Sequence, residues 1–429
     1  MDISRHKCYV FTKHKDTCSG CGACKQACKF HAISMISDNE GFLFPVLNKD
    51  KCIECGTCDK ICPCVGNKKE NATQEQSCYI ATTKRKDYYQ ESASIGICTM
   101  VSEYIISNGG YVFGAYLNEN IWKLEHILVA QKEGLNKIRN SKYLQSDTGE
   151  TFIEAKKLLD ENKTVLYIGT PCQIAGLKSF LRKEYANLYT IDLICHGVFS
   201  PKLMPLEVNY WENKLKGKIK NFRFRSKRVF KNQNGGMVNF DLTKKNKVIH
   251  IERFAKSSPS YRCFAYAGDN NSYNLRLFCY SCLFKAKSRY GDLTVGDPWF
   301  INDTCITNPI LKSSNVIRTL YSVNTTKGIF LKKAIIPFLI EEKLSWNLSF
   351  CQPAVHATKR LIPPLREILY SKLDTTDYGE LVEHLLNCDL DLAQKKFESK
   401  YKLYIIKTII KKILPLNLIW KIKKIISTI

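Results

Sequence analysis

The feature that most constrains this chain is a pair of cysteine runs within its first 65 residues. Both runs have the spacing Cys-x2-Cys-x2-Cys-x3-Cys; they comprise Cys18, Cys21, Cys24 and Cys28, then Cys52, Cys55, Cys58 and Cys62. Three closely spaced thiolates on a tight loop can bind three corners of a four-iron cubane, while the fourth cysteine points back toward the other loop. The spacing therefore predicts a small domain built around two [4Fe–4S] clusters.

This spacing is typical of bacterial ferredoxins, and Pro63 after the second run follows the same pattern. The expected ligation is crossed: one cluster takes Cys18, Cys21, Cys24 and Cys62, and the other takes Cys52, Cys55, Cys58 and Cys28. The alternatives are a structural zinc site and a disulfide framework, but zinc patterns use two separated pairs rather than two runs of four. Gly20, Gly22 and Gly56 suit the positive dihedrals of such loops. Lys29 follows the first run at the position where a proline is usual. This difference affects the turn of the first loop and not the ligation of the clusters.

Length and cysteine usage set the broad class. A chain of 429 residues with 45% hydrophobic and 24% charged residues is ordinary for a globular protein of about two to three domains. Twenty cysteines are not ordinary. A secreted disulfide protein would be short and would begin with an apolar leader, whereas this chain begins Met-Asp-Ile-Ser-Arg-His. We therefore expect a reducing compartment, the cytoplasm.

The formal net charge of +25 raises the question of nucleic-acid or membrane binding. Much of the excess lies at the C-terminus, and no helix-turn-helix, zinc-finger or RNA-binding signature accompanies it, so no nucleic-acid partner is expected. No run of eighteen or more uncharged apolar residues occurs, so no membrane-spanning helix is expected.

The first domain is expected over residues 1–75, an α+β ferredoxin-like module with a short strand at Phe42, Phe44 and Val46 between its two cysteine loops. Its two halves form an internal repeat. Residues 66–77 are polar and lack apolar periodicity, which predicts a linker.

From Cys78 onward, apolar strand patterns alternate with helical ones, which predicts a larger α/β domain with a mixed, partly parallel sheet. The expected strands are 78–82, 111–116, 164–169 and 188–194, and the expected helices are 96–107, 150–162 and 173–184. Ligand sites in such folds gather at the carboxyl ends of strands, where Gly169–Cys172 and Cys195–Gly197 fall. A hairpin is expected from 222–228 and 237–242 around Asn234-Gly235-Gly236.

Residues 386–429 form the last expected unit, a basic, amphipathic helical tail interrupted by Pro415. Lysines alternate with isoleucines there, and no acidic residue follows Glu398. This pattern predicts peripheral contact with an anionic membrane, at its inner face, or with an acidic partner. The alternative is a helix that packs on the protein's own core.

Four motifs, in order along the chain, resemble the beta-subunit family of coenzyme F420 hydrogenases and dehydrogenases. The motifs are Gly169-Thr-Pro-Cys-Gln-Ile-Ala-Gly-Leu177, Cys195-His-Gly-Val-Phe-Ser-Pro201, Cys279-Tyr-Ser-Cys282 and Gly291-Asp-Leu-Thr-Val-Gly-Asp-Pro-Trp299. The resemblance covers roughly residues 78–330, with the family's N-terminal region at 78–160 and its C-terminal region at 161–385. In the last motif, Pro298 replaces the usual phenylalanine before Trp299.

The resemblance implies FAD and a third [4Fe–4S] cluster in the α/β domain. Matching the cysteine motifs assigns that cluster to Cys172, Cys195, Cys279 and Cys282. Taken singly, Cys172 and Cys195 also fit the alternative of small buried hydrophobic residues. The remaining cysteines match no family motif; among them, Cys64 and Cys263 are the first candidates to replace a ligand.

For FAD, the expected groups are loop amides and hydroxyls that can hold a pyrophosphate beside a helix N-terminus. The candidates are Ser92, Ser94, Gly96, Lys142, Tyr143, Gln145, Ser146, Gly169 and Thr170. The family usually has a Ser-Gly-Gly run at the first of these segments, where this chain has Ile95, and a β-branched residue resists positive dihedrals. Ser92 and Ser94 also suit ordinary helix caps.

The sequence thus predicts an iron–sulfur flavoprotein oxidoreductase that moves electrons between ferredoxin-type clusters and FAD. Its expected partners are a one-electron redox protein and a two-electron substrate, either an F420-like deazaflavin or another small organic acceptor. One alternative is a non-catalytic electron-transfer subunit that docks on a separate enzyme. A redox sensor is a third interpretation, which fits the clusters but not the large α/β domain.

Overall fold

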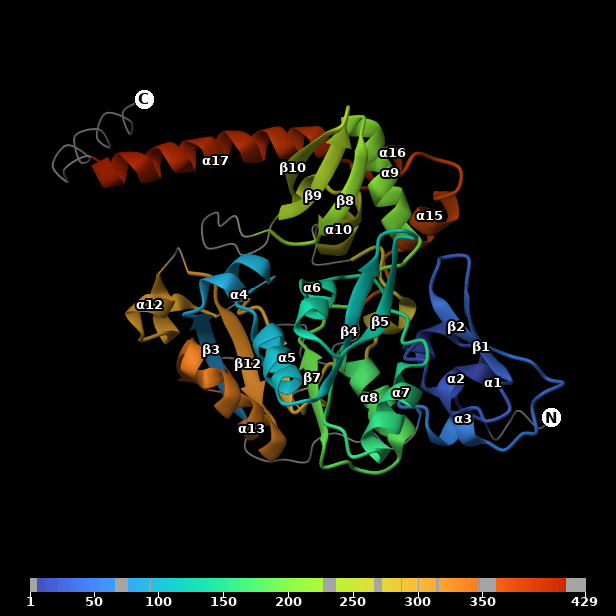
Figure 1. Cartoon of the computed structure of the whole chain (residues 1–429). Coiled ribbons are helices and arrows are strands. Elements are labelled where there is room, and N and C mark those ends of the chain that lie inside the picture. The colour runs from blue at the N-terminus through green and yellow to red at the C-terminus, as the bar shows by residue number, and fades with distance from the viewer. Residues whose placement is uncertain are drawn as a thin grey trace.

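The computed structural model describes residues 6–65, 76–92, 94–226, 237–265, 272–286, 288–299, 301–313, 316–345, 347 and 360–413. Figure 1 shows the N-terminal module, in blue, beside the helices of a large α/β body, with a smaller sheet and the C-terminal helices at the top of the view. Most of the expected linker (66–75), the turn at Asn234–Gly236 and the tail beyond residue 413 lie outside the described residues.

The N-terminal module consists of short elements around the cysteine loops. They are α1 (Tyr9–Thr12), η2 (Lys15–Thr17), α2 (Ala23–Ala27), β1 (Ile33–Ser37), β2 (Leu43–Leu47) and α3 (Thr57–Lys60). Strands β1 and β2 form an antiparallel hairpin in which Ile33 pairs with Leu47, so the strand expected at residues 42–46 is present. Gly22 and Gly56 stand before α2 and α3 with φ of +78° and +66°, the left-handed backbone that glycine adopts most readily.

An eight-stranded mixed sheet forms the centre of the body, in the order β13-β3-β12-β11-β7-β6-β4-β5. Neighbours among β4, β6, β7 and β11 run parallel, and the outer neighbours pair antiparallel, which confirms the partly parallel sheet. The strands are β3 (Ser77–Thr83), β4 (Tyr111–Asn118), β5 (Lys123–Val129), β6 (Val165–Gly169), β7 (Leu188–Leu193), β11 (Leu293–Gly296), β12 (Thr319–Val323) and β13 (Leu339–Leu344).

Helices cover both faces of this sheet because its central strands are apolar on both sides. On strand β6, Leu166 faces the core beneath α5 (Ile97–Ser107) and α13 (Thr326–Ile335), whereas Val165 and Tyr167 face α7 (Thr151–Asp160) and α8 (Pro171–Leu181). The N-terminal module packs on the second of these faces, with α2 against α7 and α8. Shorter helices of the body are α4 (Lys86–Glu91), η3 (Lys132–Gly134), α6 (Leu135–Ile138), η5 (Asp303–Cys305), α12 (Pro309–Lys312) and η6 (Ile336–Phe338).

Helix α8 begins two residues before the predicted start. Thr170 caps the helix through a reciprocal pair of hydrogen bonds with Gln173, and Pro171 occupies the first helical position. Both features favour an N-terminus at this point. As a result, Cys172 lies in the first turn of the helix, directly at the carboxyl end of β6.

A second, smaller sheet is antiparallel and has the strand order β10-β9-β8. Its strands are β8 (Lys218–Arg223), β9 (Met237–Lys244) and β10 (Lys247–Phe254). Strand β8 begins four residues earlier than predicted, and its register shifts between Lys220 and Arg223, where Asn221 has φ of +55°. This irregularity interrupts the alternation that sequence patterns rely on. The surrounding helices are α9 (Leu203–Leu215), η4 (Ala255–Ser257), α10 (Pro259–Ala265), α11 (Leu277–Tyr280), α15 (Pro364–Lys372), α16 (Tyr378–Leu385) and α17 (Leu390–Ile413).

Helix α17 is attached to the body through its first half. Gln394 accepts hydrogen bonds from the Phe254 amide and the Ser257 hydroxyl, and the Phe397 ring stacks on Phe254 at 4.4 Å. Beyond this anchor the helix extends away from the rest of the molecule (Figure 1). Within the part of the chain that the structure describes, no helix combines the length and apolar composition needed to cross a bilayer.

Candidate redox centre

Four of the predicted module ligands line one cavity: Cys18, Cys21, Cys24 and Cys62. These are the members of one crossed set, drawn from both cysteine runs. Cys21 is buried, and burial raises the pKa of its thiol to about 12, with a further contribution from the nearby Cys64 thiol. Thiols of this kind are protonated without metal and are deprotonated when iron binds, so cluster formation must release protons.

The other crossed set lies toward the outer end of the module. Cys55 is exposed, and its Sγ lies 3.4 Å from the hydroxyl oxygen of Thr57. The Cys28 Sγ accepts a hydrogen bond from the Ala32 amide at 3.4 Å. The Cys8 thiol, which the sequence did not assign, lowers the pKa of Cys58 to about 7 by hydrogen bonding to its sulfur. This set is therefore more accessible to solvent than the set that includes Cys21.

The four cysteines predicted for a third cluster come together in the body. Burial raises the pKa of the Cys172 thiol well above its usual value, and the thiols of Cys282, Cys195 and Cys279 raise it further. Burial likewise raises the pKa of Cys195 to about 12 and that of Cys282 to about 11, with Cys279 the next contributor in both cases. Mutual electrostatic effects of this kind require the thiols to be close. We call Cys172, Cys195, Cys279 and Cys282 the inner cysteines.

The sheet and one loop explain why these thiols meet. Gly169 at the end of β6 pairs with Asp192 near the end of β7, so Cys172 and Cys195 follow adjacent parallel strands at the same edge. Gly197 has φ of +143°, and a side-chain carbon at that position would lie 3.2 Å from Cβ of Cys279. Glycine therefore allows the strand end to approach α11 closely.

A buried lysine accompanies the inner cysteines. The Lys285 side chain is 4% exposed, and its Nζ donates to the carbonyls of His196 at 3.0 Å and Cys279 at 3.3 Å. Its charge opposes the rise in the pKa of both Cys195 and Cys282. Lys285 thus offers part of the positive charge that four buried thiolates require.

The module and the inner cysteines meet across helix α8. Gly176 lies one turn after Cys172, on the same side of the helix. A side-chain carbon at Gly176 would lie 3.0 Å from both Cβ and Sγ of Cys21. Cys64 also packs in this region, in one apolar cluster with Cys21, Cys172 and Cys282. One cysteine set of the module therefore lies directly against the helix that carries an inner cysteine.

The donor set fits iron–sulfur clusters better than a single metal ion. Among the described residues, no group of three or more His, Cys, Asp or Glu side chains is arranged to hold a metal ion. A cubane binds each of its four thiolates through a different iron, so its ligands surround a volume rather than converge on one point. None of the twelve predicted ligands forms a disulfide, which removes the disulfide framework as an alternative.

The three segments predicted to bind FAD are neighbours. Asn140, just before the 141–146 loop, donates to the Glu91 carbonyl at 3.2 Å and so joins that loop to the segment before α5. Gln173, in the first turn of α8, donates to the Ser146 carbonyl at 3.3 Å. Gly96 has φ of +87° and precedes α5, so the positive dihedral falls on glycine and not on Ile95. Helix α5 has no side-chain cap, which leaves its N-terminus suited to an anion.

Many of the predicted FAD side chains have partners within the protein. Ser92 lies at the C-terminus of α4 and contacts the Thr99 hydroxyl, and Ser94 contacts the Thr319 hydroxyl, so neither caps α5. Tyr143 packs among the rings of Phe224, Tyr261 and Phe264.

The later candidates are also engaged. Ser146 is hydrogen-bonded to His126 at 2.7 Å, and Thr170 lies 3.1 Å from Sγ of Cys172. Gln145 donates to the Gly20 carbonyl in the module. Lys142 donates to three backbone carbonyls, and burial lowers its pKa to about 7, with Arg223 contributing. The N-terminus of α5 therefore fits a pyrophosphate better than these side chains do.

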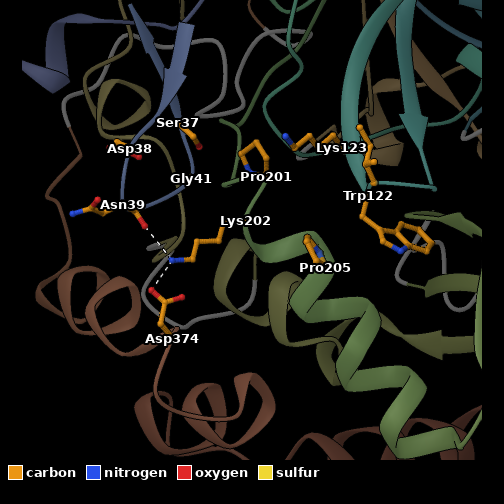
Figure 2. Close-up of a pocket in the computed structure, with 11 residues that line it drawn as sticks. Ser37, Asp38, Asn39, Gly41, Trp122, Lys123, Pro201, Lys202, Pro205 and Asp374 are labelled. Atoms are coloured by element: carbon orange, nitrogen blue, oxygen red, sulfur yellow. Dashed lines mark hydrogen bonds and ion pairs between the residues drawn. The ribbon is translucent and has the colours of Figure 1, made fainter. Parts of the chain in front are cut away.

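A surface cavity of about 330 Å³ marks the seam between the module and the body (Figure 2). Lys202, at the start of α9, donates to the Asn39 carbonyl at 3.3 Å and to Asp374 at 2.8 Å. Trp122 lines the opposite wall. None of the predicted cysteines or FAD residues lines this cavity, so it belongs to the docking of the module and not to the redox centre.

Comparisons with known proteins concern two segments of this chain. Residues 162–336 match the family described as the C terminus of the coenzyme F420 hydrogenase/dehydrogenase beta subunit. This segment is similar to that family. Residues 11–34, which include the first cysteine run, match a 4Fe-4S binding domain. The resemblance inferred from the four motifs is thereby confirmed, and a 4Fe-4S binding domain is supported at the N-terminus.

Two individual proteins are similar to this chain. It is 22% identical over 333 residues to coenzyme F420-dependent sulfite reductase from Methanocaldococcus jannaschii, an alignment that covers 74% of this chain and 47% of that protein. This chain thus spans about half the length of that relative. A chain of the xenon-derivatized F420-reducing [NiFe] hydrogenase complex from Methanosarcina barkeri superimposes with a TM-score of 0.40 at 15% identity, over 72% of this chain and 91% of that one.

Sequence reasoning did not predict that Cys64, Gly176, Arg276 and Lys285 lie between or beside the cysteine sets. Cys64 was named only as a replacement ligand and Gly176 only as part of a motif, whereas Lys285 carried a local signal because it follows Cys282 by three residues. Burial raises the pKa of Cys18, whereas the charge of the Arg276 guanidinium lowers it, although 258 residues separate the two in sequence.

Proposed function

We propose that this protein is an iron–sulfur flavoprotein oxidoreductase with two module clusters, a third cluster on the inner cysteines, and FAD. The observation that carries the proposal is the close approach of Cys21 to Gly176, one turn from Cys172. A module that served only for stability would not need its cysteine loop against the helix that bears an inner cysteine. Electron transfer between clusters does need such proximity.

The arrangement supports an order for the electron path. The crossed set that includes the exposed Cys55 faces solvent and would exchange electrons with a one-electron partner protein. The set that includes the buried Cys21 would pass them across α8 to the inner cysteines. Cys24 and Cys58, one from each crossed set, pack against the same apolar cluster, which supports electron transfer between the two module clusters.

FAD, when bound, couples a two-electron carrier to one-electron clusters. The N-terminus of α5 would hold its pyrophosphate, since its first amides have no side-chain cap and suit an anion. The sulfite reductase relative is named as dependent on coenzyme F420, so an F420-like deazaflavin is the first two-electron substrate to test, and another small organic acceptor is the second.

We also propose that the protein is cytoplasmic and touches the inner membrane face through its tail. Beyond the anchor at Phe397, helix α17 exposes Leu403, Ile405, Ile406 and Ile409 by 38% to 52%. The sequence around them is rich in lysine. Exposed apolar side chains together with positive charge suit an anionic lipid surface.

The test is anaerobic purification of the full chain, followed by iron, sulfide and flavin analysis. We expect about 12 irons, from three four-iron clusters, and one FAD per chain. A Cys279→Ser/Cys282→Ser variant should fall to about 8 irons and keep both module clusters. Cys98→Ser is the matched control, because Cys98 packs against an apolar cluster that contains none of the predicted ligands, and it should leave the iron content unchanged.

The outcomes separate the candidate functions. Wild-type protein that saturates at about 8 irons, or a double variant that loses none, would remove the inner cluster from the proposal. Three clusters without flavin after reconstitution would favour the alternative of a non-catalytic electron-transfer subunit.

A further inference from the structure

Arg276 connects the inner cysteines to the module through its backbone and its side chain. Its amide donates to the Val198 carbonyl at 3.0 Å, in the segment that follows Cys195, and its carbonyl accepts from the Cys279 amide at 2.9 Å. Its Nε donates to the Cys18 carbonyl at 2.8 Å. One residue therefore contacts the backbone of a module ligand and of an inner ligand.

The guanidinium of Arg276 is entirely buried, with 0% exposure. Its Nη1 donates to the Leu43 carbonyl and to the side-chain oxygen of Gln145, both at 3.0 Å, and its Cζ lies 3.9 Å from the centre of the Phe44 ring. The Nη2 atom is buried and has no hydrogen-bond partner among the described residues. A side-chain carbon at Gly20 would lie 3.0 Å from Cζ, so glycine there makes room for this group.

A second buried arginine, Arg366, also lies between the module and the body, and its positive charge is paired with a carboxylate, whereas that of Arg276 is not, among the described residues. Arg366 is 3% exposed and donates with Nη1 to the Glu40 carboxylate at 2.7 Å. The hydrogen-bond acceptors found for Arg276 in the described residues are carbonyl and amide oxygens. A buried cation without a carboxylate is costly unless another negative group lies beside it.

We propose that Arg276 balances the negative charge of the cluster bound by Cys18, Cys21, Cys24 and Cys62 and raises its reduction potential. This inference rests on the proposed function. Reduction adds one negative charge to a cluster that already carries four thiolates, so a fixed positive charge beside Cys18 stabilises the reduced form. Hydrogen bonds and net charge near the sulfurs are established determinants of cluster potential. Nη2 is the donor still available for this role.

The test is a redox titration of the full-length, iron-loaded protein, followed by electron paramagnetic resonance, on wild type and variants. We expect Arg276→Met to lower the midpoint potential of one cluster and to leave the others in place. Arg276→Lys keeps the charge without the planar donor set, so its shift should be smaller. Gln145→Glu adds a carboxylate beside the guanidinium at nearly constant shape, and it should lower the same midpoint while Arg276 remains.

Arg366→Met/Glu40→Gln is the matched control. It removes a buried arginine from the seam between module and body together with the carboxylate that pairs with it, so the net charge is unchanged and we expect lower stability with unchanged potentials. An equal shift in this double variant would mean that docking, and not charge, sets the potential, and the proposal would be wrong. It would also be wrong if Arg276→Met and Gln145→Glu both kept the wild-type potentials.

Gln145→Glu answers the question if Arg276→Met does not fold, because it leaves the hydrogen bonds from Arg276 to the backbone in place. Iron content separates this inference from the proposed function. Wild-type protein without clusters in the module would refute the proposed function itself. Full iron content with unaltered potentials in Gln145→Glu would refute only the role of Arg276.

Discussion

Asp192, three residues before Cys195, forms a buried ion pair with Arg289. Breaking this ion pair should loosen the strand end that positions Cys195. The side chains of Asp192 and Arg289 are 0% and 1% exposed, with Nη2 of Arg289 3.3 Å from Oδ2 of Asp192. Arg289 also donates to the carbonyls of Leu193 at 3.0 Å and Ala286 at 3.3 Å. Arg289→Met would leave a buried carboxylate without its cation and two carbonyls without a donor.

The expected cost of Arg289→Met is about 3–5 kcal/mol of unfolding free energy, the range for removing one partner of a buried pair. With an m value of about 3 kcal/mol/M, the urea midpoint should fall by about 1 M or more. Asp192→Asn alone should be comparably harmful, because it leaves the guanidinium uncompensated. The double variant removes both charges, so it should be less destabilised than the sum of the single variants by about 0.5–3 kcal/mol.

The assay is anaerobic urea unfolding followed by circular dichroism, with iron content measured in parallel. Lys156→Met is the control: it removes an exposed ion pair with Asp160 and should leave the midpoint nearly unchanged. We also expect Arg289→Met to lose iron first from the inner cysteines, because Leu193 and Cys195 belong to one strand end. A midpoint within error of wild type, or strictly additive single effects, would refute the reasoning.

Three further predictions concern separate parts of the molecule. Cys52→Ser/Cys55→Ser should reduce iron from about 12 to about 8 per chain and leave any FAD bound, measured by iron and flavin analysis; loss of flavin would contradict a binding site within residues 78–385. A chain ending at Asp391 should fail to float with anionic liposomes that carry the full-length protein, and equal flotation would exclude membrane docking by the tail. Burial lowers the pKa of His126 to about 4, so below pH 6.5 only the unfolded state gains this proton. Stability should therefore fall by up to about 1.4 kcal/mol per pH unit between pH 6.5 and pH 4, and His126→Gln should lack this part of the slope in pH-dependent unfolding.

Much of the local structure was readable from the chain. The apolar run at 164–169 predicted a buried strand and the segment 173–184 a helix, and both are present, although the helix begins at Pro171 because Thr170 caps it there. The two cysteine runs indicate clusters because their spacing leaves few other uses for eight thiols. Motif cysteines at the ends of β6 and β7 were expected to be neighbours, since adjacent parallel strands end at one edge.

Only the tertiary structure decided how the cysteine sets lie relative to each other. No local pattern could place Cys21 against Gly176 or Arg276 beside Cys18, because each contact joins segments more than 150 residues apart. The polar side chains predicted for FAD were chosen by residue type, and the fold uses several of them for its own hydrogen bonds, as with Gln145 and Ser146. The chemistry of each side chain follows from the sequence alone. The pairing of a buried charge with a particular thiol depends on how the module packs on the sheet.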